Sequence, residues 1–149
     1  MRKIENLFWT YYLQDEVCLS DEKCGKWMYF FRSSSDLERV SHLCMDAVRE
    51  GIVQKSKHTN FSSFGLNPNG ESDSGVCCFY LEADDFEGHK KIIKYFLDNQ
   101  MIQKTKSGRY HNISYKLDDQ TRAGEYGSDF KGTIKLDQFI DLNSGKFIK

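Results

Sequence analysis

The feature that most constrains the fold is an aromatic strand pattern followed directly by an amphipathic helix pattern. Residues 26–32 read KWMYFFR, a segment dense in aromatic and large apolar side chains that is typical of a buried β-strand. In residues 36–51 the apolar side chains then recur at helical spacing. Ser35 and Glu38 form a capping box and Gly51 supplies a stop, so we predict a helix between these signals.

The rest of the chain continues with further strand and helix patterns. Residues 76–83 are a second apolar strand pattern, and residues 86–100 are a second amphipathic helix pattern. The polar segment 52–59 is predicted as an edge strand or a loop, and residues 60–75 as a long surface loop. Further strands are predicted at residues 112–117, 121–126 and 132–139. This order predicts an α+β fold, with helices on one face of a curved, mainly antiparallel sheet.

Length and charge bound the class of protein. We expect residues 1–149 to form a single domain, because domains commonly run to about 100 to 200 residues. The 21 Lys+Arg against 22 Asp+Glu remove the broad attraction that drives binding to DNA or RNA duplexes. No apolar run approaches the roughly 18 to 20 residues that cross a bilayer. We therefore expect a cytoplasmic protein with neither a membrane nor a DNA or RNA duplex as partner, and the oligomeric state stays open.

Cysteine and histidine spacing gives no sign of a metal site. An odd number of cysteines without a CxxC pair fits neither a disulfide framework nor a zinc site, so we expect reduced, mostly structural thiols. The histidines form no metal-binding motif, and motifs of nucleotide hydrolases, dinucleotide-binding enzymes and serine hydrolases are also missing. We therefore expect no metal and no cofactor. His42 and His89 are predicted to be exposed helix residues.

Basic and aromatic side chains form the one candidate constellation. Lys55 and Lys57 share a face of an extended segment by side-chain alternation, and Lys116 and Arg122 come from later segments. Together with aromatic rings, such cations could stack a base and grip its phosphates. The rings considered are those of Trp27, Tyr29, Tyr115 and Tyr126. The alternative, which stays open here, is that the lysines are solvated surface charges and the rings belong to the core.

Four ordered segments, GKWMYFF, SSDLERVSHLCMDAVREGIVQKSKHTN, VCCFYLEADDFEGHKKI and YKLDDQTRAGEYG, resemble the family typified by the basophilic leukaemia expressed protein. That family's fold is similar to the cap-binding translation initiation factor. The resemblance, which covers residues 25–127, implies a curved sheet of the eight-stranded type with helices packed on its convex face and a ligand cleft on its concave side. The matching residues are Lys26, Trp27, Lys57, Lys116, Thr121 and Tyr126.

The chain also departs from these relatives. HTN follows Lys57 where the family has a KxST-like segment, and the chain is short after Gly127. The cap-binding factor clamps its base between two tryptophans and an acid, whereas this chain offers only Trp9 and Trp27. Recognition of methylated guanine caps is therefore not implied.

We therefore expect a non-catalytic nucleotide-binding protein that holds a small phosphorylated or cyclic nucleotide in a concave basic and aromatic cleft. One setting that would suit it is a phage protein that sequesters a nucleotide immune signal. The predicted ligand-binding residues are Lys26, Trp27, Lys57, Lys116, Thr121, Arg122 and Tyr126.

Two other classes of function stay open at this point. One is an enzyme that acts on a phosphoester, either phosphothreonine-lyase-like or a phosphodiesterase, with Lys57 as base and His58 or His111 as acid. The other is a protein-interaction domain that uses the helix faces.

Overall fold

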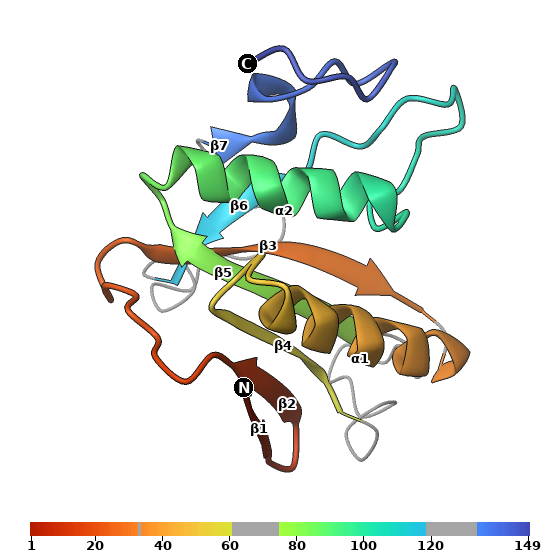
Figure 1. Ribbon diagram of the computed structural model, residues 1–149. Helices are drawn as coiled ribbons and strands as arrows, with labels where there is room; N and C mark the ends of the chain where they lie inside the picture. Colours follow the sequence, from red (N-terminus) through yellow and green to blue (C-terminus); the bar gives the residue numbers. More distant parts are fainter. Residues whose placement is uncertain (33, 61–74, 119–133) are drawn as a thin grey trace. The chain divides into compact units, whose positions relative to one another are not determined.

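The structure is a computed structural model, and it describes residues 1–32, 34–60, 75–118 and 134–149 (Figure 1). The described residues form an α+β fold, as the sequence predicts. In chain order the elements are β1 (Arg2–Glu5), β2 (Trp9–Leu13), β3 (Cys24–Phe31), α1 (Ser34–Arg49), β4 (Lys55–Thr59), β5 (Gly75–Glu82), α2 (Phe86–Asp98), β6 (Ser114–Leu117), β7 (Ile134–Lys135) and a 3-10 helix, Leu136–Gln138.

The seven strands are hydrogen-bonded in the order β1-β2-β4-β5-β3-β6-β7. The pairs β1–β2, β2–β4, β4–β5, β3–β6 and β6–β7 are antiparallel. The helix α1 links β3 to β4, and β5 lies between these two strands in the sheet. The helix α2 links β5 to β6, and β3 lies between them. This arrangement is the split βαβ connectivity. An antiparallel sheet is therefore confirmed, whereas its curvature and its likeness to the cap-binding factor stay predictions.

The chain forms two compact units, which are described separately. Unit 1 consists of Met1–Cys18 and Met28–Tyr80, and unit 2 consists of Leu19–Trp27 and Leu81–Lys149. β3 and β5 each contribute residues to both units. The single domain expected for residues 1–149 stays a prediction.

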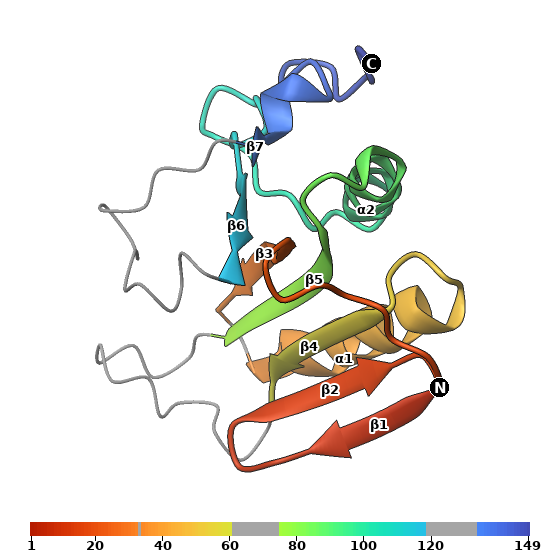
Figure 2. The same cartoon turned by 90° about the vertical axis from the view of Figure 1, so that its left-hand side faces the viewer.

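In unit 1, α1 packs along β4 and β2 through its apolar stripe (Figure 2). The helix begins at Ser34, so the predicted cap Ser35 already lies inside it. At the other end the stop is as predicted. Gly51 has a positive φ of 76°, and its N–H donates to the carbonyl of Val48 at 3.2 Å. The buried side chains of α1 are Leu37, Val40, Cys44, Ala47 and Val48.

β4 is an interior strand, so the edge strand or loop predicted for residues 52–59 was wrong. It pairs with β2 on one side and with β5 on the other. The reason is the N-terminal hairpin of β1 and β2, which the sequence patterns do not predict; its strand β2 supplies the extra partner. Of the predicted loop at 60–75, residues 61–74 lie outside the described residues.

In unit 2, Trp27 is the centre of the core, with none of its surface exposed. Its ring meets His89 of α2 edge-on, with the ring centroids 5.9 Å apart, and lies 6.1 Å from Tyr115 and 6.4 Å from Phe139. The helix α2 starts at an N-cap, Asp85, whose side chain accepts a hydrogen bond from the third helical residue. Rings from the start of β3, α2, β6 and the segment after β7 therefore share one core.

Two of the later strand predictions can be compared with the structure. β6 lies within the predicted strand 112–117, but β7 is only two residues long and a 3-10 helix follows it, so the strand predicted at 132–139 is mostly wrong. The strand predicted at 121–126 lies outside the described residues. No helix in the part of the chain that is described is long and apolar enough to cross a membrane.

The histidine predictions are half right. His42 is exposed on α1, as expected, but His89 is only 1% exposed, so its prediction as a surface residue was wrong. His89 is buried because both of its ring nitrogens find partners. The indole N–H of Trp27 donates to Nδ1 at 3.0 Å, and the Nε2–H donates to the carbonyl of Ala83 at 2.8 Å. A polar ring with both nitrogens bonded is tolerated in a core.

The cysteines are free thiols, as predicted. Four of them are buried and pack as small apolar side chains, and Cys18 is exposed. Burial raises the pKa of the Cys77 thiol, and contact with Cys44 acts in the same direction. Among the described residues, no group of His, Cys, Asp and Glu side chains could hold a metal ion.

Candidate functional site

The strand β4 presents Lys55 and Lys57 on one face and Ser56 and His58 on the other. The Ser56 hydroxyl donates to the carbonyl of Cys44 in α1 at 2.8 Å, and His58 contacts Tyr12 of β2. Lys55 and Lys57, which alternate with these two residues, lie instead over aromatic rings of β2 and β5. The shared face that the sequence predicts for the two lysines is therefore confirmed.

On this face, two ammonium groups lie among three aromatic rings. The Lys57 Nζ lies 3.8 Å from the ring centroid of Trp9, 5.8 Å from that of Tyr11 and 5.9 Å from that of Tyr80. The Lys55 Nζ lies 5.5 Å from the Tyr11 centroid and 4.6 Å from the Tyr80 centroid. We call Trp9, Tyr11, Lys55, Lys57 and Tyr80 the aromatic–lysine row; all five belong to unit 1.

Strand register explains why these side chains meet. Tyr11 of β2 is directly opposite Lys57 of β4, and Lys55 of β4 is directly opposite Tyr80 of β5. Directly opposed residues of an antiparallel pair point to the same face, within about 5.5 Å of each other. Trp9 precedes Tyr11 by two residues and therefore shares its face. The row thus follows from the pairing of three neighbouring strands.

The row is only partly accessible. Trp9, Tyr11, Lys55 and Lys57 are half-buried, whereas Tyr80 is only 4% exposed. Burial raises the pKa of the Tyr11 hydroxyl, and the neighbouring Cys78 adds to this effect. In such cation–π contacts the ring attracts the ammonium group electrostatically and so holds it over the ring face.

The three rings of the row are not among those predicted from the sequence. Of the predicted rings, Trp27 and Tyr115 are core residues, Tyr29 stacks on Phe31, and Tyr126 lies outside the described residues. The missed signal is the WTYYL segment, in which Trp9 and Tyr11 alternate with Thr10 and Tyr12. Recognised as a strand, it places two rings on one face.

Two other predicted ligand-binding residues meet in unit 2. Lys26 of β3 and Lys116 of β6 are directly opposite each other, and both are buried. The Lys26 Nζ forms an ion pair with Asp118 at 2.9 Å, which partly offsets the repulsion between the two lysines. Trp27, the next predicted residue, is fully buried and does not present its ring to a ligand. Thr121, Arg122 and Tyr126 lie outside the described residues.

Of the two acid–base pairs considered for an enzyme, Lys57 with His58 and Lys57 with His111, the first is not assembled at β4. His58 lies in the core below the strand, where its Nδ1–H donates to the carbonyl of Thr59 at 2.9 Å and its Nε2 accepts from the Tyr12 hydroxyl at 3.3 Å. Burial lowers the pKa of His58. Because Lys57 lies on the opposite face, the two side chains cannot act on the same phosphoester bond.

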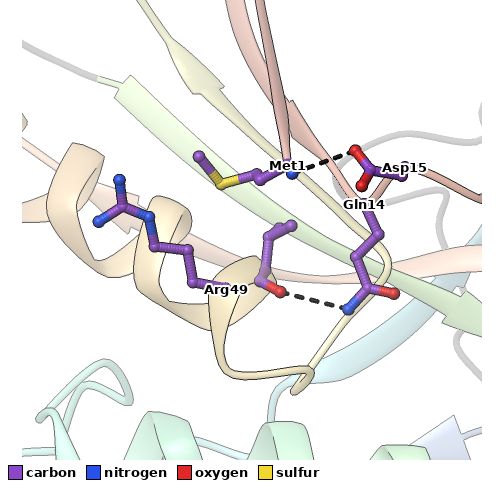
Figure 3. A pocket seen from close by; sticks show the side chains of 5 residues that line it. Met1, Gln14, Asp15 and Arg49 are labelled. Atoms are coloured by element: carbon purple, nitrogen blue, oxygen red, sulfur yellow. Dashed lines mark hydrogen bonds and ion pairs between the residues drawn. The ribbon is translucent and has the colours of Figure 1, made fainter.

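Two cavities lined by described residues offer less to a nucleotide than the row does. One of about 590 Å³, shown in Figure 3, is lined by Met1, Gln14, Asp15, Val48 and Arg49. Its Arg49 guanidinium can attract a phosphate, but no lining residue carries an aromatic ring to stack a base. Another, of about 270 Å³ in unit 2, is lined by Ala83, Asp84, Phe86, His89, Ile134, Gln138, Phe139 and Lys149. It has rings but only one lysine.

A comparison of the chain with protein-family models gives no match, and a comparison with curated proteins gives none either. The family resemblance stated above stays a prediction, and the geometry of the aromatic–lysine row is the main support for a function.

Proposed function

We propose that the protein binds a small phosphorylated nucleotide at the aromatic–lysine row and does not turn it over. The observation that carries the proposal is the clustering of two ammonium groups with three rings on one face of β2, β4 and β5. A base gains stacking energy on an aromatic ring, and a phosphate forms charge-assisted hydrogen bonds with an ammonium group. Proteins that bind single-stranded nucleic acids without a preference for base sequence combine these two elements, aromatic rings and basic side chains.

Binding without turnover is supported by the position of His58. This residue is one of the two predicted acids, the other being His111; it faces the core, and its two ring nitrogens are already used by Thr59 and Tyr12. A nucleotide on the row would therefore meet Lys55 and Lys57 but not this imidazole. A protein of this kind acts by holding its ligand, which is what a phage protein that sequesters a nucleotide immune signal would do.

The proposal is tested by calorimetric titration with adenosine, guanosine, cytidine and uridine 5′-monophosphates and with cyclic dinucleotides. We expect Lys57→Ala to weaken binding roughly tenfold to a hundredfold, because a charge-assisted contact is worth about 1.5 to 3 kcal/mol. The matched control is Lys104→Ala. Lys104 also lies over a tyrosine ring, 4.9 Å from the centroid of Tyr110, but in unit 2.

Two results would overturn the proposal. The first is a set of flat titrations across the whole panel. The second is binding by Lys57→Ala that is as tight as binding by Lys104→Ala. Turnover is tested by heating the protein after incubation and recovering the nucleotide by mass spectrometry. Recovery of intact ligand agrees with a binding protein, whereas recovery of products points to the phosphoesterase alternative.

A further inference from the structure

We infer that the ligand of the aromatic–lysine row contains two bases joined through a phosphodiester. The inference rests on the proposed function and deepens it. It comes from the placement of the groups on this face. The Lys57 ammonium group lies nearest the Trp9 ring, the Lys55 ammonium group lies nearest the Tyr80 ring, and the Tyr11 ring is within cation–π reach of both.

The first two rings are spaced for two bases. Trp9 and Tyr11 are two residues apart on one strand, so their backbone positions are about 6.5 to 7 Å apart. A single base covers one ring and leaves the next one vacant. The Lys57 Nζ lies over the Trp9 ring, 3.8 Å from its centroid, and is 5.8 Å from the Tyr11 centroid and 5.9 Å from the Tyr80 centroid, so one ammonium group is within reach of both half-buried rings. It is therefore positioned for the phosphate that links the two bases.

The second cation of the row, Lys55, lies near the Tyr11 ring as well. The Lys55 Nζ lies 5.5 Å from the Tyr11 centroid on the side of Tyr80. It is positioned for a further phosphate of the same ligand. A mononucleotide would use one ring and one ammonium group, whereas a ligand with two bases and two phosphates uses both rings and both ammonium groups.

The number of rings on which a base can stack is limited. After Tyr11 the next side chain on that face of β2 is Leu13, the last residue of the strand, which has no ring. At the other side, Tyr80 is too buried to serve as a stacking surface. Two half-buried rings therefore remain, and they match two bases better than a long single strand.

The experiment compares three adenine ligands by calorimetric titration: AMP, the linear dinucleotide pApA and cyclic di-AMP. Each stacked base is worth roughly 1 to 3 kcal/mol, so a two-base ligand should bind about 5-fold to 150-fold more tightly than AMP. Tyr11→Leu should abolish this advantage. Tyr110→Leu, at the ring of the control pair in unit 2, should keep it. If pApA binds more tightly than cyclic di-AMP, the ligand is a linear dinucleotide. If cyclic di-AMP binds more tightly, the ligand is a cyclic dinucleotide.

The outcomes separate this inference from the proposed function. If AMP binds and neither dinucleotide binds more tightly, or if Tyr11→Leu keeps the advantage, the two-base inference is wrong and the proposed function stands. If none of the three ligands binds, the two-base inference is wrong, and the four-base panel above decides the proposed function separately. Trp9→Leu removes the neighbouring ring and must also abolish the advantage, so it provides the test if Tyr11→Leu fails to fold.

Discussion

Replacing Trp27 by Phe should destabilise the protein by about 2 to 4 kcal/mol. The indole N–H donates to Nδ1 of His89 at 3.0 Å inside the core of unit 2. Phe cannot donate, so the imidazole nitrogen is left buried without its partner, at a cost of about 1 to 3 kcal/mol. The smaller ring also leaves a void beside Tyr115 and Phe139, which adds about 1 kcal/mol.

The measurement is urea unfolding followed by far-UV circular dichroism, with the free energy of unfolding extrapolated linearly to water. The matched control is Trp9→Phe, the same substitution at the chain's other tryptophan. Trp9 is half-buried, so this variant should lose less than about 1 kcal/mol. A Trp27→Phe variant no less stable than Trp9→Phe would refute the placement of Trp27 against His89.

Three further predictions concern pH, the faces of β3 and its approach to β6. Burial lowers the pKa of His58 and of His89 in the folded protein. Below the ordinary histidine pKa of about 6.5, the unfolded chain therefore binds more protons than the folded chain does. Stability should thus stay level above about pH 6.5 and fall below it, and urea midpoints that stay level down to pH 5 would contradict this. Phe31→Ala should cost about 3 to 5 kcal/mol, since Phe31 is 2% exposed. Phe30→Ala should change stability by less than about 1 kcal/mol, since Phe30 is 58% exposed, and equal urea midpoints for the two variants would contradict the strand's facing. Gly25→Ala should lower the free energy of unfolding by about 1 to 3 kcal/mol, because a Cβ there would clash with backbone and ring atoms of β6; an unchanged midpoint would rule out the close approach.

The elements with strong apolar patterns could be predicted from the sequence. β3, α1, β5 and α2 lie where the sequence predicts them, with ends that differ by one or two residues. β1 was missed because all four of its residues are exposed, so no apolar alternation marks it. β4 was assigned to an edge because it is polar. Its inward side chains, Ser56 and His58, are nevertheless satisfied by hydrogen bonds, which a local pattern does not reveal.

The candidate site was predictable only in part, for a related reason. Alternation within one segment was enough to place Lys55 and Lys57 on one face. The rings that they contact come from other strands, and their choice depends on the register of β2 and β5 against β4. The burial of His89 likewise depends on Trp27, which lies 62 residues away in the sequence. Local sequence patterns do not show which distant segments of the chain come into contact.

The split connectivity of β3 also has a consequence for the growing chain on the ribosome. Lys26, at the start of β3, forms its ion pair with Asp118, which is 92 residues further along. At roughly 5 to 20 residues per second, synthesis of that stretch takes about 5 to 18 s. All of unit 1 is translated before β6 exists, so the ring of Trp27 has to wait for Tyr115 and Phe139 to cover it. For those seconds the nascent chain carries an unfinished aromatic strand, which is when a chaperone is of most use to it.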